Sequence, residues 1–165
     1  KPVSIPVLIL PDVALAAQYA SHLPVYSLAA AAGGFSDEQE VRPLGWMAVS
    51  LGRSLSKGMF IAKVKGRSME PLIQDGSWCV FRYDQGGSRN GKVVLVESRH
   101  ISDPEGGARY TVKTYYSEIE HFDDGTWRHK KIVLSPRNPE FREIVLEDVE
   151  ASAIRVAAEF VACLP

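Results

Sequence analysis

Most of the chain alternates between short runs of β-branched or aromatic residues and turn signals, and this alternation constrains the fold more than any other feature. After Trp46 the candidate strands are Met59–Val64, Trp78–Arg82, Lys92–Glu97, Tyr110–Tyr116, Thr126–Leu134, Glu143–Leu146 and Ile154–Leu164. Turn residues separate them, as at Asp75-Gly76, Asn90-Gly91 and Asp124-Gly125. Short strands at this spacing predict a mostly β domain, a compact sandwich or barrel-like fold with short helices.

Length and composition favour a single packed domain with an additional arm. The chain has 165 residues, 45% of them hydrophobic and 24% charged, which supports a packed core and argues against global disorder. The formal net charge of −1 gives no global reason to bind nucleic acid, so we do not expect direct nucleic-acid binding.

No apolar run reaches the ~18 residues of a membrane-spanning helix. Cys79 and Cys163 form no CxxC pair and fit free thiols in a reducing cytosol, which predicts a cytoplasmic protein.

The N-terminal segment differs from the strand-rich remainder. Val3–Leu10 is a candidate strand, and Val13 to about His22 is a candidate helix with apolar residues at helical spacing. Ala29–Ala32 and the pair Gly33-Gly34 follow. Adjacent glycines favour an extended, adaptable backbone, which a peptide bond needs in order to enter a protease cleft.

A turn around Ser68 and a later strand lysine suggest catalytic chemistry. Ser68 lies in Gly66-Arg67-Ser68-Met69-Glu70-Pro71, and a serine hydroxyl needs a base within hydrogen-bond reach to become a nucleophile. No histidine lies near Ser68 in the sequence. Lys113 can replace it if its amine is neutral, and burial in an apolar pocket lowers the pKa of a lysine. On the strand, Thr111, Lys113 and Tyr115 share one face, so hydroxyl groups can hold the amine.

Each element alone also has a simpler interpretation. Gly66 and Pro71 frame a turn that Ser68 caps, Lys113 is a strand lysine with its charge in solvent, and the alanine–glycine segment is a flexible linker. The joint occurrence of all three in a β-rich chain favours the catalytic interpretation.

Two further patterns suggest ligands less strongly. His121, Asp123, Asp124 and His129 lack metal-site spacing and fit a hairpin turn better, so we expect no metal and no cofactor. Arg128 and Lys130 alternate on a strand beside Trp127, a pattern that a solvated strand face explains better than a phosphate site.

Together these pieces resemble the LexA, UmuD and phage-repressor group of self-cleaving serine peptidases. The order matches, with 35 residues (68 − 33) from Gly33 to Ser68 and 45 (113 − 68) from Ser68 to Lys113. The resemblance covers roughly residues 29–165. It implies that Ser68 is the nucleophile, that Lys113 is its base, and that the N–H groups of Ser68 and Met69 bind the oxyanion. It also implies hydrolysis of the Ala32–Gly33 bond, with Ala31–Ala32 as the second choice.

The resemblance also predicts a domain organisation. We expect residues 1–32 to form an N-terminal arm, or the remnant of an upstream region, and residues 33–165 to form the peptidase domain. Because the chain begins at Lys1 without a methionine, we interpret it as part of a longer protein. Self-cleavage would then separate an upstream effector from this domain, a stress or defence switch that an activating filament triggers in the family. The alternatives are a non-catalytic dimerisation or sensing module and a peptidase that processes other chains.

The C-terminal run Ile154–Leu164 is apolar on both faces. A terminal strand of this kind predicts an exposed edge that pairs with a copy of itself. In the LexA family the last strand forms a two-fold dimer, so the resemblance implies a homodimer. The alternative is a strand in the interior of the sheet.

Overall fold

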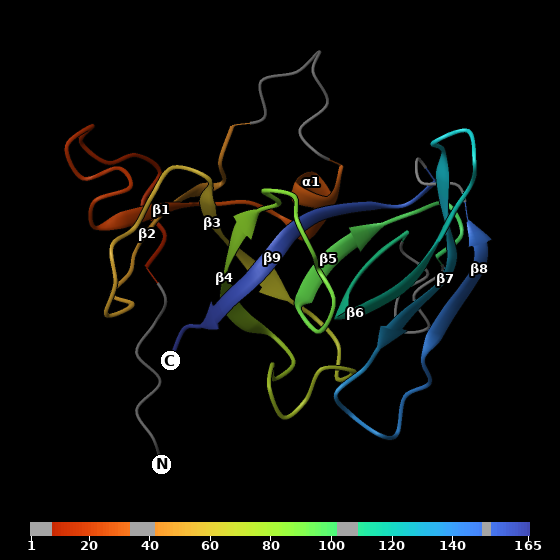
Figure 1. Cartoon of the computed structure of the whole chain (residues 1–165). Helices are drawn as coiled ribbons and strands as arrows, with labels where there is room; N and C mark the ends of the chain where they lie inside the picture. Colours follow the sequence, from red (N-terminus) through yellow and green to blue (C-terminus); the bar gives the residue numbers. More distant parts are fainter. Residues whose placement is uncertain (1–7, 34–41, 102–108, 150–152) are drawn as a thin grey trace.

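The protein is described by a computed structural model that covers residues 8–33, 42–101, 109–149 and 153–165 (Figure 1). Nine strands and one short α-helix lie in the described part. Their bounds are β1 His22–Val25, α1 Leu28–Ala32, β2 Gly45–Ala48, β3 Met59–Val64, β4 Ser77–Tyr83, β5 Val93–Glu97, β6 Tyr110–His121, β7 Trp127–Ser135, β8 Ile144–Val149 and β9 Arg155–Cys163. The prediction of a mostly β fold is confirmed, and each strand expected after Trp46 is present.

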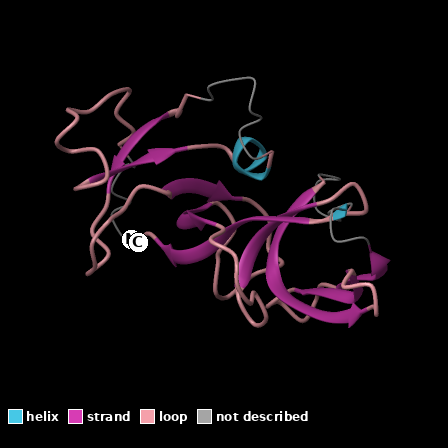
Figure 2. Ribbon diagram, turned by 45° about the horizontal axis from the view of Figure 1, so that its top comes forward, coloured by secondary structure: helices cyan, strands magenta, loops and turns pink. Residues whose placement is uncertain are grey.

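The strands form one open sheet in the order β2-β1-β3-β4-β9-β5-β6-β7-β8. Neighbouring strands are antiparallel except β1 and β3, which run parallel. The strands bend strongly, and α1 packs near the middle of the molecule against β3, β5 and β9 (Figure 2). No helix among the described residues is long and apolar enough to cross a bilayer.

The expectation that the last strand is an exposed edge is wrong. β9 lies between β4 and β5, with Phe160 opposite Phe81 on one side and Ala158 opposite Leu95 on the other. Most of β9 is partly buried and its apolar side chains pack against the core clusters, so an interior strand shows the same sequence pattern as an apolar edge. The expected homodimer therefore stays a prediction, without an exposed β9 edge as its support.

The core cluster beneath α1 anchors the catalytic candidates. Phe60 and Phe81 are fully buried and stack with their ring centroids 5.7 Å apart. Met69 and Ile73, which follow Ser68 in the turn between β3 and β4, belong to the same cluster and are 2% and 0% exposed. Burial of these two side chains fixes the turn to the sheet.

The helix expected over Val13 to His22 is not formed. The Tyr19 N–H donates to the His22 carbonyl at 2.8 Å, and φ of Tyr19 is 59°, so the backbone turns back. His22 already begins β1, whose Leu23 and Val25 are fully buried. Pairing and burial of β1 thus override a helical spacing of apolar residues, since helix propensity is a weak preference.

Of the strand expected at Val3–Leu10, residues 3–7 lie outside the described part. Leu10 makes an isolated antiparallel bridge with Trp46, next to Gly45 at the start of β2. A Cβ at Gly45 would lie 2.7 Å from the Leu10 carbonyl oxygen. Glycine therefore permits the close approach of these two backbone segments.

The extended backbone expected at Gly33-Gly34 is not found at Gly33, which caps the helix α1 formed by Leu28–Ala32. Ser27 caps α1, because its Oγ accepts the Ala30 N–H at 3.1 Å. Alanine has the highest helix propensity of any residue, so the alanine run forms a helix once a cap is present. Gly33 ends the helix with φ −68°, and Gly34 lies outside the described residues.

Candidate active site

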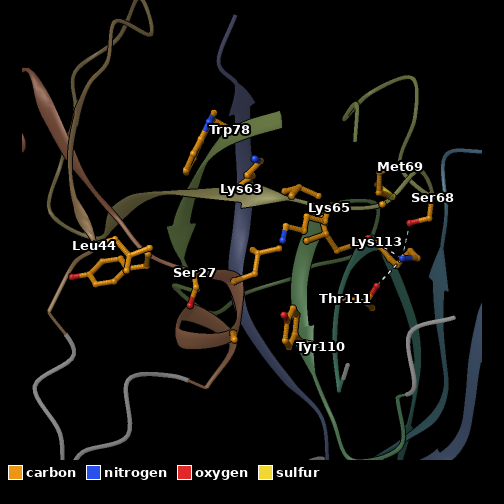
Figure 3. A pocket seen from close by; sticks show the side chains of 16 residues that line it. Ser27, Leu44, Lys63, Lys65, Ser68, Met69, Trp78, Tyr110, Thr111 and Lys113 are labelled. Carbon is orange, nitrogen blue, oxygen red and sulfur yellow. Dashed lines mark hydrogen bonds between the residues drawn. The ribbon is translucent and has the colours of Figure 1, made fainter. Parts of the chain in front are cut away.

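Ser68 and Lys113 lie in direct contact inside the protein, although 45 residues separate them along the chain. The Lys113 amine nitrogen, Nζ, is 2.9 Å from Ser68 Oγ and 2.6 Å from Thr111 Oγ1 (Figure 3). It also lies 3.2 Å from the Val112 carbonyl oxygen. Ser68 is 8% and Lys113 3% exposed. The structure thus brings together the two residues that the sequence pairs as nucleophile and base.

Two different elements deliver this pair. Thr111 and Lys113 point from the same face of β6, an interior strand of the sheet, and Lys113 lies opposite Val94 of β5. Ser68 lies in the turn after β3, where Gly66 adopts φ 104°, a left-handed conformation that favours glycine. The Gly66 N–H donates to Asp75 Oδ1 at 2.7 Å, which closes the turn across its base. The motif residues on either side of Ser68 therefore shape the turn that presents its hydroxyl.

A cavity of about 580 Å³ opens beside the pair. Its volume falls within the range of about 300–1,000 Å³ that is typical of ligand pockets. Ser68 and Lys113 lie at one side, while Ser27 and Leu44 lie at the other (Figure 3). Apolar side chains dominate the lining: Leu28, Leu44, Val64, Met69, Trp78, Tyr110 and Val112. A cleft of this kind accepts an apolar peptide segment next to a nucleophilic hydroxyl.

The candidate scissile bond lies apart from this cavity. Ala29 is the lining residue nearest to the bond along the chain, and Ala32 is 1% exposed in the core below α1. The Ala32 carbonyl accepts a hydrogen bond from Arg155 Nη2, and the Gly33 N–H donates to the Ala29 carbonyl at 3.0 Å. The Ala32 carbonyl is therefore bound by a guanidinium and the Gly33 N–H by a helical carbonyl. Neither group contacts Ser68 or Lys113 in these bonds.

Sequence reasoning missed the residues that hold the Ser68 turn from behind. Asn138 and Arg137 donate hydrogen bonds to the backbone of the turn, and Asn138 is only 8% exposed. In the sequence, the pair Pro136 and Pro139 marks this segment as a turn. That signal does not identify what the turn contacts, because its partner is distant along the chain.

The other patterns raised by the sequence have structural explanations. Arg128 pairs with Glu120 at 3.1 Å and with Asp148 at 3.4 Å, so carboxylates on the two neighbouring strands already bind this arginine. His129 packs edge-on against Trp127, with ring centroids 5.1 Å apart. Within the described ranges, no three His, Cys, Asp or Glu side chains gather into a possible metal site.

Comparison with known proteins agrees with this geometry. The sequence model described as Peptidase S24-like matches residues 24–161, a span from β1 to β9 that contains both Ser68 and Lys113. Comparison with curated protein sequences finds no match. The family match covers well over half of the chain and indicates serine peptidase activity in general. The chain belongs to the S24-like peptidase family, the LexA- and UmuD-type self-cleaving peptidases.

Proposed function

We propose that this chain is a self-cleaving serine peptidase in which Ser68 attacks its own Ala32–Gly33 bond with Lys113 as the base. The observation that carries the proposal is the buried 2.9 Å contact between Lys113 Nζ and Ser68 Oγ. Both side chains line the apolar cavity, where a peptide segment can reach the hydroxyl. A buried serine–lysine contact at the edge of such a cavity is an arrangement for nucleophilic catalysis.

The proposed mechanism requires a neutral Lys113 amine. Burial disfavours the charged ammonium form of a lysine. A neutral amine has two N–H bonds and one lone pair. The N–H bonds can be donated to Thr111 Oγ1 and the Val112 carbonyl, at 2.6 and 3.2 Å. In the proposed reaction the lone pair of the neutral amine takes the Ser68 hydroxyl proton, which is the role of a general base.

The proposed reaction moves this proton twice. Lys113 takes the hydroxyl proton as Ser68 Oγ forms a bond to the Ala32 carbonyl carbon. The N–H groups of Ser68 and Met69 stabilise the negative charge on the carbonyl oxygen. The bond between Ala32 and Gly33 then breaks, and Lys113 returns the proton to the new Gly33 amine. Water, deprotonated by Lys113, releases Ala32 from Ser68.

The register of the sheet supports Ala32 as the residue that reaches Ser68. Val25 of β1 lies opposite Ile61 of the parallel strand β3, an offset of 36 residues (61 − 25). Ser68 lies the same 36 residues (68 − 32) beyond Ala32. β3 itself ends at Val64, so this register would bring an extended chain only as far as the turn that carries Ser68, with Ala32 closest to it. We infer that the helical form of α1 is the resting state and the extended form is the cleavable state.

Cleavage at this point would cut the covalent link between the region before Gly33, which includes β1, and the rest of the peptidase domain. The function would be a one-shot switch, in which a stress signal or filament that favours the extended form starts the reaction. One observation favours a second candidate, a peptidase acting on other chains. In the resting state the cavity is not lined by the Ala32–Gly33 bond, which leaves room for a separate peptide.

The first prediction concerns the dyad. Ser68→Ala and Lys113→Arg should both abolish cleavage, the latter because a guanidinium stays protonated and cannot act as a base. In the wild type the rate should rise with pH as Lys113 loses its proton and then level off. Intact mass spectrometry over time measures all three proteins. Ser98→Ala is the matched control, since Ser98 is another buried serine, 4% exposed and bonded to the Ala153 carbonyl.

A wild-type rate in Ser68→Ala would contradict the serine mechanism. A rate that stays constant between about pH 6 and 10 would contradict a lysine base.

The second prediction concerns the bond. N-terminal sequencing should find a product that begins Gly-Gly-Phe-Ser, and Gly33→Val should block cleavage because a β-branched side chain crowds the scissile bond. A mixture of Gly33→Val, which keeps the dyad, with Ser68→Ala, which keeps the bond, separates the two candidate functions. For self-cleavage neither chain is cut in the mixture. Cleavage of the Ser68→Ala chain would instead establish action on other chains.

The third prediction concerns the resting state. Arg155→Ala should speed self-cleavage about 3- to 10-fold, because it removes the hydrogen bond that holds the Ala32 carbonyl away from Ser68. Arg128→Ala is the control, an ion-paired arginine on β7. The rates of both variants are measured at one pH on the plateau. An unchanged or slower rate in Arg155→Ala would show that this contact does not restrain the bond.

A further inference from the structure

The turn that carries Ser68 is held from behind by a segment that follows β7. The backbone N–H groups of Arg137 and Asn138 both donate to the Ser68 carbonyl, each at 3.0 Å. The Asn138 side-chain nitrogen, Nδ2, donates to the Arg67 carbonyl at 3.1 Å, across 71 positions of the sequence. Two consecutive carbonyls of the nucleophile turn therefore face the same buried asparagine.

These contacts also fix the direction of the Ser68 and Met69 N–H groups. In a trans peptide unit the C=O and N–H bonds lie in one plane and point in opposite directions. The Arg67 carbonyl shares its unit with the Ser68 N–H, and the Ser68 carbonyl shares its unit with the Met69 N–H. In the described part of the chain the only cis bond is Glu70–Pro71, so both units are trans. Holding the two carbonyls at the back therefore directs the two N–H groups away from Asn138.

We propose that Asn138 is a positioning residue for the oxyanion hole, acting through the two peptide units that flank Ser68. This inference rests on the proposed function, because the two N–H groups matter only if a tetrahedral intermediate forms at Ser68. Asn138 does not contact the reacting atoms. It sets the direction of the donors before the reaction, so they need no reorientation when charge develops on the carbonyl oxygen.

Asn138 is itself held firmly enough for this role. Its side-chain oxygen, Oδ1, accepts the Glu140 N–H at 3.0 Å, and its carbonyl accepts the Phe141 N–H at 3.1 Å. The neighbouring Arg137 donates from Nε to Thr114 Oγ1 at 3.3 Å, one residue after Lys113 on β6. One segment thus contacts both the turn of the nucleophile and the strand of the base.

The chemistry of the amide explains why asparagine occupies this position. Oδ1 closes the local turn while Nδ2 donates to the Arg67 carbonyl, so both ends of the side chain are used. Aspartate keeps the acceptor but loses the donor, and its charge would lie near the carbonyl that it should hold. Alanine loses both contacts and leaves the backbone bonds to Ser68 in place.

The test compares pH–rate profiles of self-cleavage for the wild type, Asn138→Ala, Asn138→Asp and a control. The control is Asn90→Ala, because Asn90 Oδ1 also accepts a backbone N–H, that of Ser117, at 2.8 Å. Thermal melting confirms that each variant is folded. We expect the plateau rate to fall about 10- to 100-fold in both Asn138 variants, as for a weakened oxyanion donor, with the midpoint of the profile unchanged. Asn90→Ala should keep the wild-type rate.

An unchanged midpoint of the pH–rate profile distinguishes a role in positioning the oxyanion donors from a general loosening of the Ser68 turn. Lys113 contacts Ser68 directly, so a loosened turn would change the surroundings of the amine and move the midpoint. A wild-type plateau in a folded Asn138 variant, or a lower plateau with a shifted midpoint, would overturn the inference while self-cleavage itself stands. Failure of the wild type and Asn90→Ala to cleave at any pH would overturn the proposed function and this inference with it.

Discussion

A lysine amine buried against a serine hydroxyl is the interaction on which the rest of the structure depends. A buried amine needs partners for its N–H bonds, and it stays reactive only if those partners leave its lone pair available. Thr111 and the Val112 carbonyl meet the first need from β6 itself. The partner for the lone pair, the Ser68 hydroxyl, comes from another element, the turn after β3. The open sheet joins these elements through β4, β9 and β5, which lie between β3 and β6.

The same architecture separates the catalytic pair from its candidate substrate. The alanines of α1 have two roles. They favour the helical conformation, and Ala31 and Ala32 are small enough to pack into the core. That packing competes with the extended form that a scissile bond must adopt. Arg155, which also pairs with Glu97, donates a hydrogen bond to the Ala32 carbonyl and so stabilises the helical form. A switch of this kind needs two conformations of similar free energy, and a short five-residue helix provides one that is easily unwound.

Much of the fold could be predicted from the sequence because its signals are local. β-branched runs and glycine turns indicated the strands after Trp46, and the Gly66–Pro71 motif with Lys113 indicated the dyad. The errors arose where local patterns are ambiguous. Apolar residues on both faces of β9 fit an edge or an interior strand, and only the pairing with β4 and β5 decides between them. Alanines followed by glycines fit a linker or a capped helix. Asn138 could not be identified, because its role depends on a contact 71 positions away.

The central claim is that the Lys113 amine is neutral when it meets Ser68. Nuclear magnetic resonance titration of a lysine-labelled Gly33→Val protein, which keeps the dyad intact, tests this most directly. The account predicts that Lys113 titrates with a pKa well below the ordinary lysine value of about 10.4. A Lys113 amine that stays protonated up to that value would contradict the account, because it could not accept the proton of Ser68.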